Sequence, residues 1–469
     1  MLLKSYPFVV SYVEELSGKL EAQSSDKQRL SRIQKVWISF CLSAMLLTNT
    51  LCWACFERVS FGSYKARALS WMFLRSLSFW EQILNASVAL IFEKFEINNG
   101  TLVVDDSDRT RSKNTSHIYG VHKILDKKTG GYCMAQNIVM LLLVSDKISV
   151  PVGFKFYLPD PKLAAWELNE KILKEQNVPK KKRPAKPERS VKFPTKQDLA
   201  TQMVEEFRAN HPKINVKGIL ADAAFLSPQF SKNAKRIYPK AQIVSQIKSN
   251  QKVLFKGKPI GVNEFFKAQT PLTEKLSLRG GEPKTVHYST ARLEVCSHGK
   301  ILLIVALKYG NEDEYRYLAA SDLTWRGKDI VYLYAFRWLV EVFFFDWKGY
   351  EGWAQLACQH GVDGSFRGLI LSLLLDHCLL FHPEQSARLK NQKPAVTVGS
   401  LRTAIIAKSF VDHVQDVLDS PCPQNRLEEL KHSVASIIEF RSSGKHMSGR
   451  VMEKMGPTGS LEKRYRHAA

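Results

Sequence analysis

Residues 334–348 read YAFRWLVEVFFFDWK, and this stretch decides how the rest of the chain is interpreted. The spacing predicts one α-helix. At about 100° per residue, Tyr334, Arg337, Glu341 and Lys348 fall within an arc of roughly 60° on it. A carboxylate flanked by two cations and a phenol therefore lines one side of the helix, and we expect core packing around it. The remaining positions are mostly apolar: Phe336, Trp338, Leu339, Val340, Val342, Phe343, Phe344, Phe345 and Trp347.

This polar stripe has two interpretations. Cations beside a carboxylate suit a site that handles phosphate and binds a divalent metal. The alternative is an ion pair between Arg337 and Glu341, four residues apart on a solvated strip, which is a common arrangement on helices. The stripe alone does not separate the two.

Two further acids follow apolar β-type runs. Val103-Val104-Asp105-Asp106-Ser107 ends one run, and Ile219-Leu220-Ala221-Asp222 ends a later one. A phosphoryl-transfer site with two metal ions needs carboxylates that hold the ions about 4 Å apart, and strand ends are rigid places to mount them. Taken singly, each acid also fits a turn after a strand, because Asp is a common turn former.

The spacing Tyr-x2-Arg-x3-Glu-x6-Lys resembles the signature of the DDE transposases of IS-four-type insertion sequences. The resemblance implies an α/β, ribonuclease-H-like mixed sheet with two aspartates on strands and a glutamate on a later helix. It assigns Asp105, Asp222 and Glu341 as catalytic residues that hold two Mg²⁺ or Mn²⁺ ions. In the family the first aspartate stands two residues before Ser or Thr, which favours Asp105 and leaves Asp106 as the alternative.

The resemblance also implies roles for the other polar residues of the helix. Tyr334, Arg337 and Lys348 are expected to bind DNA phosphates near the cleaved end, Arg as a planar fork and Lys as a point charge. One feature departs from the family, because Asp222 is followed by Ala-Ala-Phe225 and not by the usual acidic or Gly-Tyr-like residues.

Hydrophobic spacing divides the chain into helical and β-rich parts. We expect helices over 12–20, 27–55, 63–77, 79–95, 163–174, 197–210 and 369–381, and strands over 101–105, 118–124, 135–144, 148–156 and 216–222. The predicted domains are an N-terminal helical DNA-binding domain (1–95), the first part of the ribonuclease-H-like core (96–240), a β-rich insertion (241–322), the rest of the core with the Glu341 helix (323–385), and a C-terminal helical and basic region with possible dimer contacts (386–469).

The composition favours a polyanionic partner. The chain has 469 residues, with 68 Lys and Arg against 45 Asp and Glu, for a formal net charge of +23. Such a charge suits DNA, and an anionic membrane is the competing partner. The tract Lys180-Lys-Lys-Arg-Pro-Ala-Lys-Pro-Glu-Arg189 is expected to be an exposed loop, either touching DNA or simply solvated.

Two other features bear on location. The pair Cys52 and Cys55 lacks a second zinc-ligand pair, so we expect buried free thiols in a reducing, cytoplasmic setting. The uncharged stretch 36–56 is long enough to span a bilayer, but its Ser, Thr and Asn residues favour a buried helix and no membrane association.

Together these features predict a bacterial cut-and-paste transposase, associated with the nucleoid when bound to DNA. It would cleave double-stranded DNA at transposon terminal inverted repeats, join the ends to target DNA, and act as a homodimer on DNA. The alternatives are a metal-dependent nuclease on the same fold, a non-catalytic DNA-binding protein descended from a transposase, and a basic membrane protein anchored by residues 36–56.

Overall fold

The computed structural model describes residues 4–23, 28–126, 129–225, 227–278, 282–310, 312–353 and 359–437. The 12 strands in these residues form one continuous mixed sheet. The strands are β1 Asn99–Arg111, β2 Val121–Leu125, β3 Tyr132–Val144, β4 Ser149–Tyr157, β5 Asn215–Ala221, β6 Gln242–Ile247, β7 Lys252–Phe255, β8 Lys258–Gly261, β9 Leu272–Leu276, β10 Lys284–Val295, β11 Lys300–Tyr309 and β12 Arg316–Ala320.

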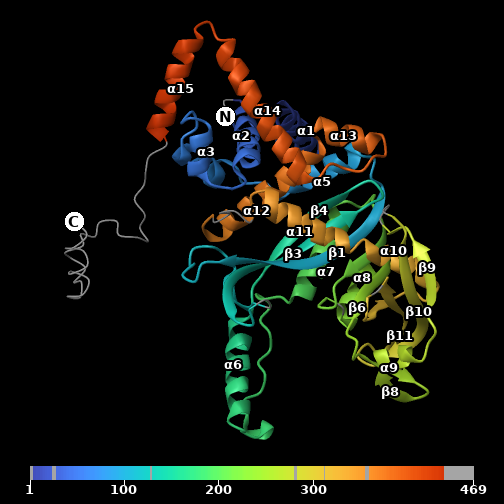
Figure 1. Ribbon diagram of the computed structural model, residues 1–469. Coiled ribbons are helices and arrows are strands. Elements are labelled where there is room, and N and C mark those ends of the chain that lie inside the picture. The colour runs from blue at the N-terminus through green and yellow to red at the C-terminus, as the bar shows by residue number, and fades with distance from the viewer. Residues whose placement is uncertain are drawn as a thin grey trace, which may run out of the picture.

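Helices surround this sheet (Figure 1). In the first half of the chain they are α1 Pro7–Gln23, α2 Arg32–Thr48, α3 Trp53–Val59, α4 Ala66–Trp71, the π-helical turn η1 Met72–Ser76, α5 Trp80–Lys94, α6 Pro161–Glu175, the 3-10 turn η2 Lys180–Lys182 and α7 Lys196–Asn210. In the second half they are α8 Pro228–Ile237, α9 Val262–Lys267, α10 Gly327–Ala335, α11 Trp338–Tyr350, α12 Gly361–Leu380, α13 Pro383–Lys390, α14 Val398–Leu418 and α15 Pro423–Ile437.

The centre of the sheet has the strand order β4-β3-β1-β5-β6. Strand β3 is antiparallel to both β1 and β4, whereas β5 and β6 run parallel to β1. Three antiparallel strands followed by two parallel ones is the ribonuclease-H-like arrangement. The predicted fold class is therefore confirmed.

The remaining strands extend the same sheet. Strand β12 is antiparallel to β6, and β11, β10, β7 and β8 follow outward, with β9 paired to β10. They enclose a small core of their own around Val253, Phe266 and Ile304, covered by α9. Strand β6 begins at Gln242, inside the range predicted as the insertion, but its parallel pairing to β5 makes it part of the central sheet.

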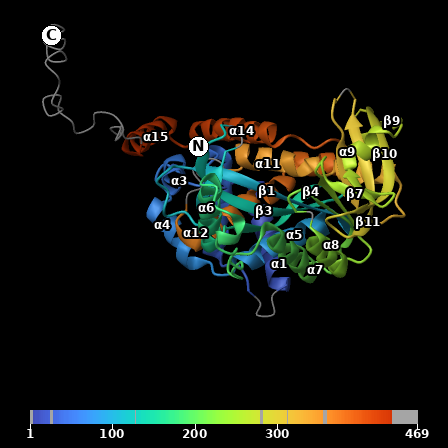
Figure 2. The same ribbon diagram turned by 90° about the horizontal axis from the view of Figure 1, so that it is seen from below.

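The central sheet is covered on both faces. Alternate residues point to opposite faces of a strand, so neighbouring positions enter different cores. Val103, Leu220 and Val244 pack with α10, α11 and α12, and the positions next to them pack with α7 and α8. Figure 2 shows α11 and α14 on one side of β1 and β3, with α7 and α8 on the other.

The N-terminal helices belong to the same hydrophobic core as the first of these faces. Helix α1 packs on α2 and α5, and α12 contacts both α2 and α5. Buried side chains of α1, α2 and α5 form one cluster with those of α11 and α12. The helices over 12–20 and 79–95 that the sequence predicted are confirmed as α1 and α5.

Two predicted helices are interrupted. The one expected over 27–55 is broken, because Asn49 takes a left-handed conformation (φ 51°) that ends α2 and turns the chain by 87° into α3. The apolar face of α2, including Trp37, Phe40 and Met45, is buried. Within the described residues no single helix is long and apolar enough to cross a membrane, and two bent pairs, α2–α3 and α12–α13, meet that criterion only when combined.

The second correction concerns residues 334–348, which form two helices and not one. Helix α10 ends at Ala335 and α11 begins at Trp338. Between them the amides of Phe336 and Arg337 donate to carbonyls three residues back, which is a tighter turn than an α-helix makes. Three apolar residues expected in the core are exposed instead, at 51%, 40% and 67%: Trp338, Val342 and Phe345.

Candidate active site

The two strand-end aspartates lie side by side. Strands β1 and β5 are parallel neighbours in which Val103 pairs with Leu220 and Val104 with Ala221. Asp105 follows Val104 within β1, which continues to Arg111 and so beyond the predicted strand 101–105, whereas Asp222 directly follows the last residue of β5. Both share the face of Val103 and Leu220, which is the face covered by α10 and α11.

Close packing sets α10 and α11 against these strand ends. A side chain at Gly218 of β5 would place its Cβ 3.0 Å from Leu333, so glycine lets α10 approach the sheet. At the other end, Trp347 stacks on Trp353 with ring centroids 4.9 Å apart and donates to Ser372 Oγ of α12 at 2.9 Å. These contacts fix the turn between α10 and α11 above Asp105.

Arg337 bridges the first aspartate and the glutamate. Its Nη1 donates to Asp105 Oδ2 at 3.3 Å, and its Nη2 donates to Glu341 Oε1 at 2.6 Å. The Arg337 and Asp105 side chains are 19% and 13% exposed, while that of Glu341 is 39% exposed. The predicted ion pair between Arg337 and Glu341 therefore exists, but it faces the sheet and not a solvated strip. The same guanidinium also pairs with the buried Asp105 carboxylate.

Burial raises the pKa of Asp105 to about 7. The amide of Asp106, which donates to Asp105 Oδ1 at 2.8 Å, and the charge of Arg337 act in the opposite direction. The charges of Asp222 and Asp106 raise the pKa further. Arg337 and the Asp106 amide thus only partly offset the effect of burial on the Asp105 carboxylate.

Asp106 faces the other side of the sheet. Its carboxylate pairs with Lys196 Nζ at 2.7 Å and accepts from Asn137 Nδ2 at 2.9 Å. Lys196 begins α7, on the face opposite α11. The period of two along β1 therefore separates the two candidate aspartates, and only Asp105 lies with Asp222 and Arg337.

Tyr334 and Lys348 also turn toward the sheet. The Tyr334 side chain is buried, its hydroxyl donates to Gln246 Oε1 at 3.3 Å, and burial raises its pKa to about 12. Lys348 donates to Ser107 Oγ and, at 2.9 Å, to the carbonyl of Asp108. Burial lowers the pKa of Lys348, although the charge of Asp108 opposes this.

Sequence reasoning missed several residues around the site. Lys196, Asn137 and Gln246 each contact one of the polar groups described above. Only Lys196 carried a local signal, since it follows Thr195, whose hydroxyl caps α7 in a capping box with Asp198. The contacts themselves join residues far apart in the chain, such as Lys196 with Asp106.

Asp105, Asp222 and Glu341 suit a divalent cation in their chemistry, because hard cations prefer carboxylate oxygens. Burial is the main cause of the raised pKa of Asp105, and a cation bound there would stabilise the charged carboxylate. Within the described residues, however, no three His, Cys, Asp or Glu side chains gather closely enough to hold a metal ion. Glu341 turns toward Arg337, so joining the two aspartates would require it to leave that partner.

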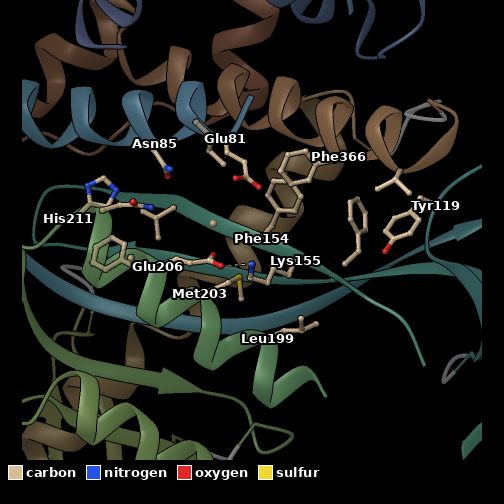
Figure 3. A pocket seen from close by; sticks show the side chains of 17 residues that line it. Glu81, Asn85, Tyr119, Phe154, Lys155, Leu199, Met203, Glu206, His211 and Phe366 are labelled. Carbon is tan, nitrogen blue, oxygen red and sulfur yellow. Dashed lines mark hydrogen bonds and ion pairs between the residues drawn. The ribbon is translucent and has the colours of Figure 1, made fainter. Parts of the chain in front are cut away.

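A separate cavity of about 560 Å³ lies between α5, β4, α7 and α12 (Figure 3). Its charged lining includes Lys155 and Glu206, which pair with each other at 2.7 Å. His211, also in the lining, packs against Phe92 and Phe207, and burial lowers its pKa to about 4. None of the strand-end acids lines this cavity.

The structure also describes the CxxC pair and part of the C-terminal region. Cys52 and Cys55 are free and partly buried. Helices α14 and α15 occupy 398–437, and the part of the predicted C-terminal region beyond residue 437 lies outside the described residues.

A ribonuclease-H-like sheet with aspartates on and after two adjacent parallel strands, and a glutamate on the helix above them, is the arrangement expected of acid-site nucleases and transposases on this fold. In agreement, residues 74–261 match the family model described as "DDE superfamily endonuclease". This range contains Asp105 and Asp222, covers less than half of the chain, and ends before α11. No curated protein matches the chain.

The match supports a DDE-type transposase family and a nuclease- or transposase-type function. It implies DNA as the substrate. Nucleases of this superfamily typically use divalent metals.

Proposed function

We propose that this protein is an insertion-sequence transposase of the IS-four type, which cleaves DNA at transposon ends and transfers the strands to target DNA. The observation that carries the proposal is that Arg337 pairs with both Asp105 and Glu341, while Asp222 follows the strand next to that of Asp105. The two aspartates lie inside the matched endonuclease range, and Arg337 and Glu341 belong to the Tyr-Arg-Glu-Lys signature.

Asp105, Asp222 and Glu341 would hold Mg²⁺ or Mn²⁺, two ions per site, and the metal would supply charge neutralisation at the reacting phosphate. In the cleavage step a water oxygen bonds to phosphorus and the bond to the 3′ oxygen breaks, leaving a 3′-hydroxyl and a 5′-phosphate. In the joining step the oxygen of that 3′-hydroxyl bonds to a target phosphorus, and the bond from this phosphorus to the target's own 3′ oxygen breaks, with no covalent enzyme intermediate.

Arg337, Lys348 and Tyr334 would position the DNA strand. Arg337 already reaches between the carboxylates, and its second function would be to hold a phosphate once Glu341 is released. Lys348 of α11 donates to Ser107, which is two residues after Asp105 on β1 and faces the same side of the sheet. The positive charge therefore continues along that face. Tyr334 is buried against Gln246 and would act by orienting Arg337, whose guanidinium lies over its ring at 5.8 Å.

Two active sites are needed to join two ends, so we propose a homodimer on DNA, with the N-terminal helices reading the terminal repeats. Exposed apolar side chains on α14, among them Phe410 (67%) and Val411 (62%), support a role of the C-terminal region in dimer contacts. A cytoplasmic, nucleoid-associated protein fits this activity.

The test uses the full chain and the DNA that flanks its own coding sequence, which would carry the terminal repeats. With Mg²⁺ present we expect cleavage at the element boundary and, with added plasmid, covalently joined products. Mn²⁺ binding followed by electron paramagnetic resonance gives a second readout and should be lost in Asp222→Asn.

Each alternative has its own outcome in this test. Cleavage without joined products would indicate a nuclease. Specific DNA binding without cleavage or metal binding would indicate a non-catalytic descendant, and the proposal would fall.

A further inference from the structure

One part of the molecule is not used by the site described so far: a projecting arm of residues 158–195, which we call the α6 arm. It consists of α6, the turn η2 and the segment that returns to α7. Figure 1 shows α6 standing away from the sheet and the other helices. In α6 itself only Leu163 is buried, so the body of the protein does not cover this helix.

The arm is an ordered unit, and its return segment is attached along α6. Arg183 pairs with Glu170 of α6 at 2.9 Å and donates from Nε to the carbonyl of Val178 at 2.7 Å. Both side chains of this ion pair are largely buried, at 16% and 14% exposure. Trp166 of α6 donates to the carbonyl of Pro184 at 2.9 Å. The basic tract is therefore exposed as expected, but it is not a free loop.

The base of the arm lies beside the acidic strand ends. Strands β1 and β4 are both antiparallel to β3, so they run in the same direction and end at the same edge of the sheet. The arm leaves from Tyr157 at the end of β4 and returns at Lys196, which pairs with Asp106 at 2.7 Å and lies over the Tyr157 ring at 5.2 Å. Asp106 is adjacent to Asp105 in β1 but faces the other side of the sheet, so the arm is anchored behind the strand that carries Asp105.

The tip of the arm carries concentrated positive charge. Residues 176–187 contain five Lys and Arg and no acid. Arg183 is used in holding the tip together, whereas Lys180, Lys181 and Lys182 are exposed. None of these three lysines forms an ion pair within the part of the chain that the structure describes. Three adjacent ammonium groups are thus presented to an outside partner.

We propose that Lys180, Lys181 and Lys182 bind the phosphate backbone of duplex DNA that flanks the cleavage site. Fifteen residues make α6 about 22 Å long, equal to about six or seven base pairs of B-DNA. The tip would therefore contact phosphates about two thirds of a helical turn away from the base of the arm. The inference rests on the proposed function, because it takes the strand-end acids as the place where DNA is cut.

Charge and shape favour DNA over an anionic membrane as the partner. Surface binding to lipid generally combines basic residues with apolar side chains that enter the acyl layer. The tip segment 179–187 offers Lys, Arg, Pro and Ala, with no large apolar side chain. Contacts of ammonium groups with phosphates need none, and they carry no sequence information.

The test compares two triple variants of the full chain. Lys180→Gln, Lys181→Gln and Lys182→Gln together remove the tip charge. The matched control, Lys213→Gln, Lys217→Gln and Lys240→Gln, removes three exposed lysines near the starts of β5 and β6, at the opposite edge of the sheet. Affinity for a random duplex of about 40 base pairs is measured in EDTA over a range of NaCl concentrations.

For the tip variant we expect the slope of log K against log salt to become shallower by about 2 to 3, since each neutralised phosphate contributes about 0.9. Affinity near 0.1 M salt should fall by roughly 10- to 100-fold, and the control should change the slope by less than about 1. Shortening the duplex on one side of a boundary cleavage site to below about seven base pairs should weaken wild type and leave the tip variant unchanged.

Equal slopes for the two triple variants would overturn the proposal. So would a tip variant that loses binding to phosphatidylserine vesicles but keeps its DNA affinity. If wild type fails to cut with Mg²⁺ but the tip variant still shows the shallower slope, the transposase assignment fails, and of the arm proposal the binding of duplex DNA by the tip stands without the cleavage site. If wild type cleaves normally and the tip variant has an unchanged slope, the arm proposal fails and the transposase assignment stands.

Discussion

Two groups of carboxylates lie at the two ends of α11, and they differ in how their charge is balanced. At the start, Glu341 and Asp105 share the guanidinium of Arg337, and the Glu341 side chain is 39% exposed. At the far end, Glu351 is fully buried near Asp346 and Asp376. No Lys or Arg forms an ion pair with these three within the described residues.

The two groups differ in whether a cation and solvent reach the carboxylates. Burial, with the charges of Asp376 and Asp346, raises the pKa of Glu351 well above its usual range, and burial raises the pKa of Asp376 to about 7. A buried carboxyl group without a cation takes up a proton. The group at the start of α11 has a cation and an opening to solvent, as a site for metal and phosphate requires.

The largest expected effect is on Asp105. Asp105→Asn should reduce Mg²⁺-dependent cleavage on the order of 10³-fold, because it removes a carboxylate oxygen at the strand end. Asp106→Asn, one residue away on the opposite face, should cost about tenfold at most. Cleavage rates on one substrate measure both. A large loss in Asp106→Asn with near-normal activity in Asp105→Asn would reverse the assignment.

Arg337 gives the next largest effect. Arg337→Ala should lower cleavage by roughly 10²-fold, since it removes the group that reaches both carboxylates and, as proposed, a phosphate. Arg337→Lys should recover only part of this loss, because one ammonium cannot span two acceptors as a planar fork does. Full activity in the lysine variant would mean that Arg337 supplies charge alone.

The buried acids predict a pH effect on stability and not on activity. The native pKa of Glu351 lies above the unfolded one, so unfolding releases a proton, and its contribution to stability is lost as the pH rises from about 4 through neutrality. Glu351→Gln should differ from wild type least near pH 5 and should be the more stable of the two near pH 8. Thermal unfolding at both pH values checks this, and an equal difference at both would contradict it.

The smallest effect is expected at the ion pair between Lys196 and Asp106, on the face of β1 opposite Asp105. Lys196→Met removes the partner of Asp106, whose side chain is 21% exposed, and should lower stability by about 0.5 kcal/mol. Chemical denaturation measures this change. A loss above about 2 kcal/mol would show that the pair is coupled to the strand-end acids through β1.

The local pattern of apolar residues was enough to predict the strands of the central sheet. The apolar runs at 135–144 and 148–156 became β3 and β4, and the run ending at Ala221 became β5, because strands buried on both faces are almost continuously hydrophobic. The helix over 334–348 failed as a single element. Its periodicity continued through Phe336 and Arg337, but packing of α10 on β5 required a tighter turn there.

The sequence by itself determined that acids follow two apolar runs, that Arg337 and Glu341 are close enough along the chain to pair, and that the chain is strongly basic. These are local or compositional properties. Tertiary structure alone decided that Asp105 and not Asp106 faces Asp222, that Arg337 lies between Asp105 and Glu341, and that the basic tract forms the tip of an arm. Each of those depends on pairing between residues distant in the chain, which one-dimensional periodicity does not encode.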